Sequence, residues 1–245
     1  LTPFKRWEVL GNHQYGVCVA VTWANMRRLV TGTLTQEIYP NLKNVIDLYK
    51  TQNPFFPVQD MGMDIQLMLN HVRKNGDPLG TKPVAFAKLN VRNLEEIKAA
   101  IYIFGGIVLG MAVQAGTMND FYEQKPLDYH PINEGNITGL HAILAGGYMG
   151  ESRDDVRIVT WGRECTLTQI CWEKLVANQY GEAWCVIWEE SLGTEQFVQG
   201  IDLAALAKAF KALTNTELPI TIPPPILTPK RKVDILWDAH KELHK

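Results

Sequence analysis

Cys18 has the sequence context most typical of a reactive side chain. It follows a turn rich in glycine and amide residues, 11–17 (GNHQYGV), and precedes an apolar run with helical spacing, Val19 to Val30. The first N–H groups of a helix are unpaired and carry partial positive charge, so a sulfur there is favoured as the thiolate, the form that attacks carbonyl carbons. The sequence therefore predicts a nucleophile at the start of a helix.

His141 is the candidate base for this nucleophile. Segment 139–148 (GLHAILAGGY) places it at the start of an apolar strand, and an imidazole can take a proton from a thiol and return it to a leaving group. Three other histidines fit structural positions better: His13 in an exposed turn, His71 on a helix surface and His130 in a loop. The remaining cysteines are interpreted as inert: Cys165, Cys171 and Cys185.

Composition narrows the function classes. The chain has 245 residues, 46% of them hydrophobic and 20% charged, which is enough to bury a substantial core. The formal net charge is −2 and no dense Lys/Arg stripe occurs, so neither nucleic acid nor an anionic membrane is an expected partner. The longest apolar stretch, 101–113, is too short for a membrane span, and the N-terminus lacks the order of a secretory signal. No metal, nucleotide or dinucleotide motif is present, so no cofactor is expected.

The order of the periodic segments predicts an α+β fold with helices first and an antiparallel sheet second. A left-handed C-cap is expected at Gly76, and Asn93 is expected to cap a helix while Glu96 reaches back to it. Residues 150–155 are interpreted as a hairpin turn. The expected helices are 19–30, 42–49, 65–75, 93–101 and 168–176, and the expected strands are 107–113, 141–148, 156–161 and 183–188.

The order of these features resembles the papain-like cysteine peptidase superfamily, in a divergent bacterial or bacteriophage branch. Asn12 lies six residues before Cys18, where papain-like enzymes usually carry glutamine, and Gly16-Val17-Cys18 matches their Gly-x-Cys segment. Segment 140–148 resembles the superfamily's His-Ala-x-x-x-x-Gly-Tyr strand, and 158–162 (IVTWG) resembles its Asn-Ser-Trp-Gly segment. The resemblance runs to about Trp188 and implies a helical half, with a buried nucleophile helix, packed on an antiparallel sheet or barrel half.

The resemblance also implies roles for individual residues. The Cys18 thiolate, paired with an imidazolium at His141, would attack the substrate and carry the acyl group of the acyl-enzyme. The oxyanion would be received by the N–H of Cys18 and the side-chain amide of Asn12 or, failing that, Gln14. Trp161 would shield the histidine from water.

In the papain-like superfamily, the asparagine of the Asn-Ser-Trp-Gly segment orients the catalytic histidine, and this chain departs from that pattern. The position of this asparagine is occupied by Val159, whose side chain cannot form a hydrogen bond. Thr160 is adjacent and would offer its hydroxyl if the strand were displaced, although its side chain would ordinarily point to the other face of the strand.

Beyond the papain-like domain, 1–190, the sequence predicts an amphipathic helix in 191–216 and a proline-rich strap with a basic tail in 217–245. Such a tail is suited to contact a protein partner.

Two function classes follow from these features. One is a thiol hydrolase for peptide or amide bonds, including the crosslinking peptides of a bacterial cell wall, and it is favoured by Cys18 and His141. The other is a papain-fold module with little or no activity, kept for binding or assembly, for example in a bacteriophage particle. Val159 and the tail favour this second class.

Overall fold

The computed structural model describes residues 7–33, 37–148 and 155–188, together with five positions between 207 and 217. Apart from those five positions, the predicted C-terminal helix and the strap lie outside the described residues, as does most of the predicted turn at 150–155. The described helices and strands are, in chain order, α1 (Cys18–Thr33), α2 (Leu42–Tyr49), α3 (Ile65–Asn75), β1 (Pro83–Leu89), α4 (Leu94–Phe104), β2 (Ile107–Val113), α5 (Ala115–Tyr122), the 3₁₀ turn η1 (Pro131–Asn133), β3 (Gly139–Tyr148), β4 (Val156–Thr160), β5 (Arg163–Leu167), α6 (Gln169–Cys171), the π-helical turn η2 (Trp172–Val176) and β6 (Glu182–Trp188).

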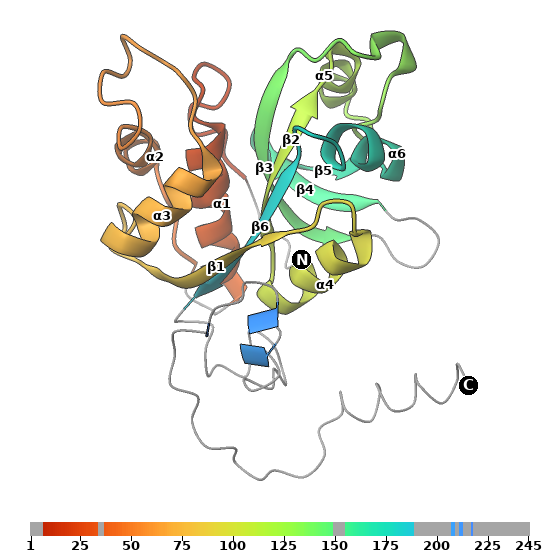
Figure 1. Cartoon of the computed structure of the whole chain (residues 1–245). Coiled ribbons are helices and arrows are strands. Elements are labelled where there is room, and N and C mark those ends of the chain that lie inside the picture. Colours follow the sequence, from red (N-terminus) through yellow and green to blue (C-terminus); the bar gives the residue numbers. More distant parts are fainter. Residues whose placement is uncertain are drawn as a thin grey trace, which may run out of the picture.

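The strands form one antiparallel sheet in the order β1-β6-β2-β3-β4-β5. The α+β class and the antiparallel sheet are therefore confirmed. Two strands were not predicted: β1, which begins with proline and carries Lys88, and β5 (RECTL), which has no apolar run. β6 lies between β1 and β2, so the final strand closes onto a strand of the helical first half (Figure 1).

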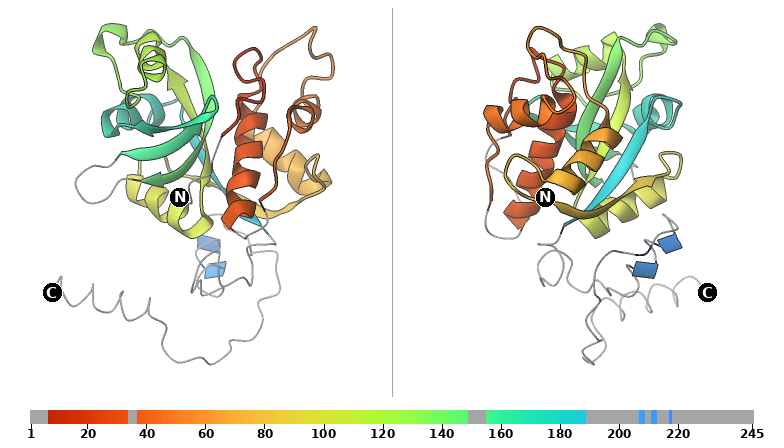
Figure 2. Two further views of the ribbon diagram at one scale, coloured as in Figure 1. Left: turned by 180° about the vertical axis from the view of Figure 1, so that it is seen from behind. Right: turned by 60° about the vertical axis from the view of Figure 1, so that its left-hand side comes forward.

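Two apolar clusters occupy opposite faces of the sheet. Along β6 the side chains alternate: Trp184, Val186 and Trp188 join the cluster that contains α1, α2 and α3, while Cys185 and Ile187 join the cluster that contains α4 and η2. This is the period-two pattern of a strand buried on both faces. Helix α1 lies against β3, and Figure 2 shows it running alongside the strands.

The helix caps follow the local sequence, with two differences from prediction. Asn93 caps α4 by accepting the N–H of Glu96 (3.2 Å), but the Glu96 carboxylate accepts the N–H of Asn90 rather than that of Asn93. The expected reciprocal capping box is therefore wrong. Gly76 has a positive φ of 90°, but its ψ of 161° lies outside the left-handed helical region, so the predicted C-cap geometry is also wrong.

Candidate active site

Cys18 is the first residue of α1, and its side chain is half-buried. The helix begins with a hydrogen bond from the N–H of Val21 to the carbonyl of Val17 (2.9 Å). Residues 19–31 are all buried, which leaves the first residue of the helix as its partly exposed end. The backbone N–H of Ala142 in β3 reaches the Cys18 thiol. The sulfur therefore lies against the strand segment that carries His141, the residue next to Ala142.

The chain before α1 connects the nucleophile turn to the end of the sheet. Trp7 donates its indole N–H to Glu164 of β5 (3.0 Å). Val9 packs so closely on Gly162 that a β-carbon there would lie 2.7 Å from the Val9 side chain. Residues 10–16 then turn into the helix, with positive φ at Leu10 (49°) and Gly11 (84°). The segment that leads into the nucleophile turn is therefore in contact with the hairpin formed by β4 and β5, although the two are about 150 residues apart in sequence.

His141 is buried in β3 and contacts Thr160 and Trp161. Its Nε2 lies 2.7 Å from Oγ1 of Thr160, which is 3% exposed, and its ring stacks on Trp161 with a centroid separation of 4.2 Å and an interplanar angle of 8°. The structure thus brings together three of the residues named from sequence, and it gives the second ring nitrogen of His141 a fixed partner.

The register of the sheet explains why Thr160 makes this contact and Val159 does not. Val159 pairs with Leu144, and both side chains belong to the apolar cluster around α1. One further residue along this register, Thr160 lies opposite Ile143 and diagonal to His141, on the other face of the sheet. Thr160 therefore points to the other face of the strand from Val159, as expected, but no displacement of the strand is needed for the contact, because His141 lies on that same face.

Trp161 and Gly162 form the two-residue turn between β4 and β5. Both have positive φ, 41° and 81°, between the paired residues Thr160 and Arg163, which is the pattern of a type I′ hairpin turn. Phe121 of α5 packs edge-on against Trp161 at 4.8 Å, and the Arg163 guanidinium covers the Phe121 ring at 4.0 Å. The contact of Phe121 with Trp161 depends on α5, a helix that was not predicted from the sequence.

Burial disfavours the charged form of both candidate catalytic groups. It raises the pKa of the Cys18 thiol, and the Asp60 carboxylate raises it further, while backbone N–H groups of Ala142, Val19 and Cys18 lower it. Burial lowers the pKa of His141 to about 3. Both shifts favour the neutral thiol and the neutral imidazole, and the thiolate–imidazolium pair expected from sequence stays a prediction.

Asn12 and Gln14 lie in the turn before Cys18. Asn12 is half-buried, and its N–H donates to the carbonyl of Val9 (3.0 Å). Gln14 is exposed, with its N–H donating to Gly11 (3.0 Å). Within residues 7–33, 37–148 and 155–188, neither side-chain amide has a hydrogen-bond partner.

Asp60 and Tyr49 complete the surroundings of the nucleophile turn. The Asp60 carboxylate accepts the N–H of Gly16 (2.9 Å) and the hydroxyl of Tyr49. The sequence carries no signal for the contact between Gly16 and Asp60, which joins segments 44 residues apart.

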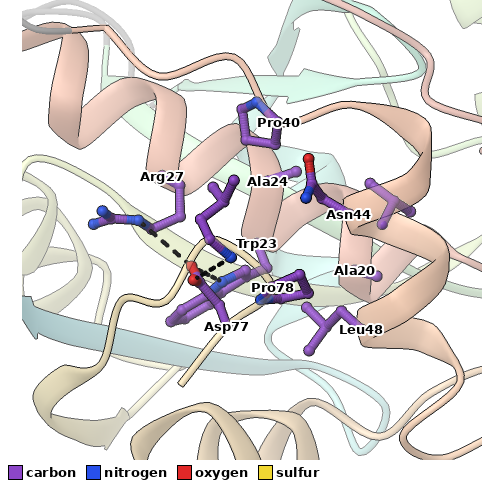
Figure 3. A pocket seen from close by; sticks show the side chains of 11 residues that line it. Ala20, Trp23, Ala24, Arg27, Pro40, Asn44, Leu48, Asp77 and Pro78 are labelled. Carbon is purple, nitrogen blue, oxygen red and sulfur yellow. Dashed lines mark hydrogen bonds and ion pairs between the residues drawn. The ribbon is translucent and has the colours of Figure 1, made fainter.

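The remaining candidates lie elsewhere. Cys171 and Cys185 are buried, and burial raises the pKa of both; Cys165 is half-buried in β5. In the described part of the chain, no group of three or more His, Cys, Asp or Glu side chains could hold a metal ion, and no helix has the length and apolar character to cross a membrane. A shallow pocket between α1, α2 and residues 77–79 surrounds the buried ion pair of Arg27 and Asp77, and neither Cys18 nor His141 lines it (Figure 3).

Comparison with known proteins identifies the fold. No protein-family model matches the sequence, and no curated protein matches it. Among solved structures, the chain is similar to xylellain, a cysteine protease from Xylella fastidiosa, with a TM-score of 0.58 and 18% sequence identity over 77% of this chain and 84% of that chain. The papain-like fold implied by the sequence resemblance is thereby confirmed.

Proposed function

We propose that this protein is a thiol-dependent hydrolase that cleaves peptide or amide bonds through Cys18 and His141. The observation that carries the proposal is the placement of the Cys18 thiol, at the start of α1, against the β3 segment whose histidine is hydrogen-bonded to Thr160 and stacked on Trp161. Acyl transfer requires a nucleophile next to a base that a third group orients, and the contact of the thiol with the N–H of Ala142, the residue after His141, supports this arrangement. The cysteine protease with a similar fold supports this choice of chemistry.

The mechanism starts from the uncharged pair. We assign the Nε2 hydrogen of His141 to the contact with the Thr160 oxygen, 2.7 Å away, and this tautomer makes Nδ1 the basic nitrogen. His141 takes the thiol proton as the sulfur attacks the carbonyl carbon, and the imidazolium then protonates the leaving amine. Water attacks the resulting thioester with His141 again as base, which releases the acid and restores the thiol.

The oxyanion is received by the N–H of Cys18 and the Asn12 amide. The N–H of Gly16 does not contribute, because it donates to Asp60. The Asn12 side chain has no other partner among the described residues, so its amide is free to turn toward the oxyanion. Gln14, which is exposed, is the second candidate for this role.

A panel of substrates with matched variants tests the proposal. Mixed-sequence fluorogenic peptides and the stem peptides of bacterial cell walls are incubated with the wild-type protein and with the Cys18→Ala, His141→Ala and Cys165→Ala variants. We expect the first two variants to lose at least about a thousandfold in kcat/KM. Cys165→Ala, which removes another half-buried thiol, keeps the wild-type rate. A Cys18→Ala protein that hydrolyses at the wild-type rate contradicts the proposal.

The second candidate function is a binding or assembly module of low activity, such as a component of a virus particle. The directions of the two pKa shifts favour it, because burial of Cys18 and His141 opposes the preformed thiolate of a strongly activated cysteine. This second function is supported if the wild-type protein binds peptides of the panel but cleaves none of them.

A further inference from the structure

The turn before Cys18 is attached to residues 60–62 by a hydrogen-bond network that the proposed mechanism does not use. Asp60 accepts from Gly16 (2.9 Å) and from the hydroxyl of Tyr49, and that hydroxyl accepts the N–H of Gly62 (2.9 Å). A β-carbon at Gly16 would lie 2.7 Å from Oδ1 of Asp60 and 3.3 Å from the backbone of Gly62. Only glycine allows the turn to approach the loop this closely.

The loop that carries Asp60 is itself anchored. Asn53, which is 4% exposed, donates its amide to the carbonyl of Gly62 (2.6 Å) and accepts the N–H of Met61 (3.1 Å). The ring of Phe56 packs edge-on against Tyr15 at 4.9 Å and Tyr49 at 5.2 Å. These contacts hold the Asp60 carboxylate in one position relative to the nucleophile turn.

We propose that Asp60 is a positioning residue of the nucleophile: it fixes the turn before Cys18 through Gly16, and it keeps a negative charge beside the thiol. The proposal deepens the proposed function and rests on it for turnover. Asp60 forms no ion pair with any residue in 7–33, 37–148 or 155–188, so no cation neutralises its charge.

The two parts of this role have separate chemical consequences. The fixed turn aligns the N–H of Cys18 and the Asn12 amide with the attacked carbonyl. The charge favours the neutral thiol, since the Asp60 carboxylate raises the pKa of Cys18 in addition to burial. The titratable groups that interact with the thiol are Asp60 from the loop and Tyr49 from α2.

Two substitutions separate the charge from the geometry. Asp60→Asn removes the charge but keeps an acceptor for the N–H of Gly16. Tyr49→Phe keeps the charge but removes the hydroxyl that joins Asp60 to Gly62. Asp47→Asn, at an exposed carboxylate on α2 that pairs with Lys43, is the control for loss of one negative charge. Thermal unfolding of each variant confirms that it is folded.

Two readouts are measured on the full chain. The pH dependence of Cys18 alkylation by iodoacetamide, followed by peptide mass mapping, reports the pKa of the thiol without any substrate. We expect its midpoint to move to lower pH in Asp60→Asn and to stay at the wild-type position in Asp47→Asn. On a peptide substrate, we expect Tyr49→Phe to lower kcat about tenfold, with a smaller change in KM.

The outcomes are distinguishable from failure of the proposed function. If the wild-type protein hydrolyses no peptide, the proposed function is contradicted. The pH midpoint of Cys18 alkylation still tests whether the charge of Asp60 affects the thiol. An unchanged midpoint in Asp60→Asn overturns the electrostatic part of the proposal. Wild-type kcat in Tyr49→Phe overturns the positioning part.

Discussion

At the scale of single residues, the side chain that holds His141 is the most informative difference from the papain pattern. A threonine hydroxyl both donates and accepts, so it fixes the tautomer of the ring less strictly than an asparagine carbonyl does. We expect Thr160→Val, which keeps the shape and removes the hydroxyl, to lower kcat about tenfold to a hundredfold because the basic nitrogen loses its orientation. Steady-state kinetics on a peptide substrate measures this effect. An unchanged kcat contradicts the assigned contact.

Asparagine substitutions at Val159 and Thr160 should have different effects, because the two side chains lie on opposite faces of the sheet. Val159→Asn places an amide in the apolar cluster around α1, on the face away from His141, so we expect it to destabilise the protein by about 1–3 kcal/mol without raising activity. Thr160→Asn places the amide on the face of the histidine. Chemical denaturation and kinetics of both variants check this assignment, and higher activity in Val159→Asn contradicts it.

At the scale of elements, the β4–β5 turn positions Trp161 and contacts the segment before Cys18. A β-carbon at Gly162 meets Val9 at 2.7 Å, whereas one at Gly135, which also has a positive φ (74°), meets nothing within 4 Å. We expect Gly135→Ala to cost about 1 kcal/mol from backbone strain alone, and Gly162→Ala to cost about 1–3 kcal/mol more because Val9 must move.

Urea denaturation of the two alanine variants measures the difference, and Gly162→Ala should also lose turnover as Trp161 shifts from His141. Equal stability of the two variants would mean that the turn does not depend on its contact with Val9.

At the scale of the whole molecule, the buried imidazole makes stability depend on pH. The unfolded chain takes a proton on His141 near its ordinary pKa of about 6.5, but the folded protein does not take it until about pH 3. The free energy of unfolding should therefore fall as the pH decreases from about 6.5 toward 3. His141→Gln should flatten this dependence. Melting temperatures of the wild type and of this variant between pH 7 and pH 4 test the prediction, and identical slopes in the two proteins contradict it.

The sequence was informative where chemistry and local pattern coincide. The Cys18 turn, its helix and the strands 107–113 and 183–188 carry local signals, so the order of the elements and the papain-like fold could be predicted. The contacts of Asp60 with Gly16 and of Phe121 with Trp161 could not, because each depends on segments brought together only by the finished fold. The face of Thr160 depends on strand register, which the sequence of one strand does not contain.

The most direct measurement of the Cys18–His141 pair is the rate at which a peptidyl electrophile modifies Cys18 at pH 6, in the wild type and in His141→Ala. Because burial favours the neutral form of both groups, attack by the sulfur requires His141 to accept the thiol proton. We predict that Cys18 in the wild type reacts at least about a hundredfold faster than in His141→Ala, while labelling of Cys165 is the same in both. Equal rates at Cys18 would contradict a shared site for the thiol and the imidazole.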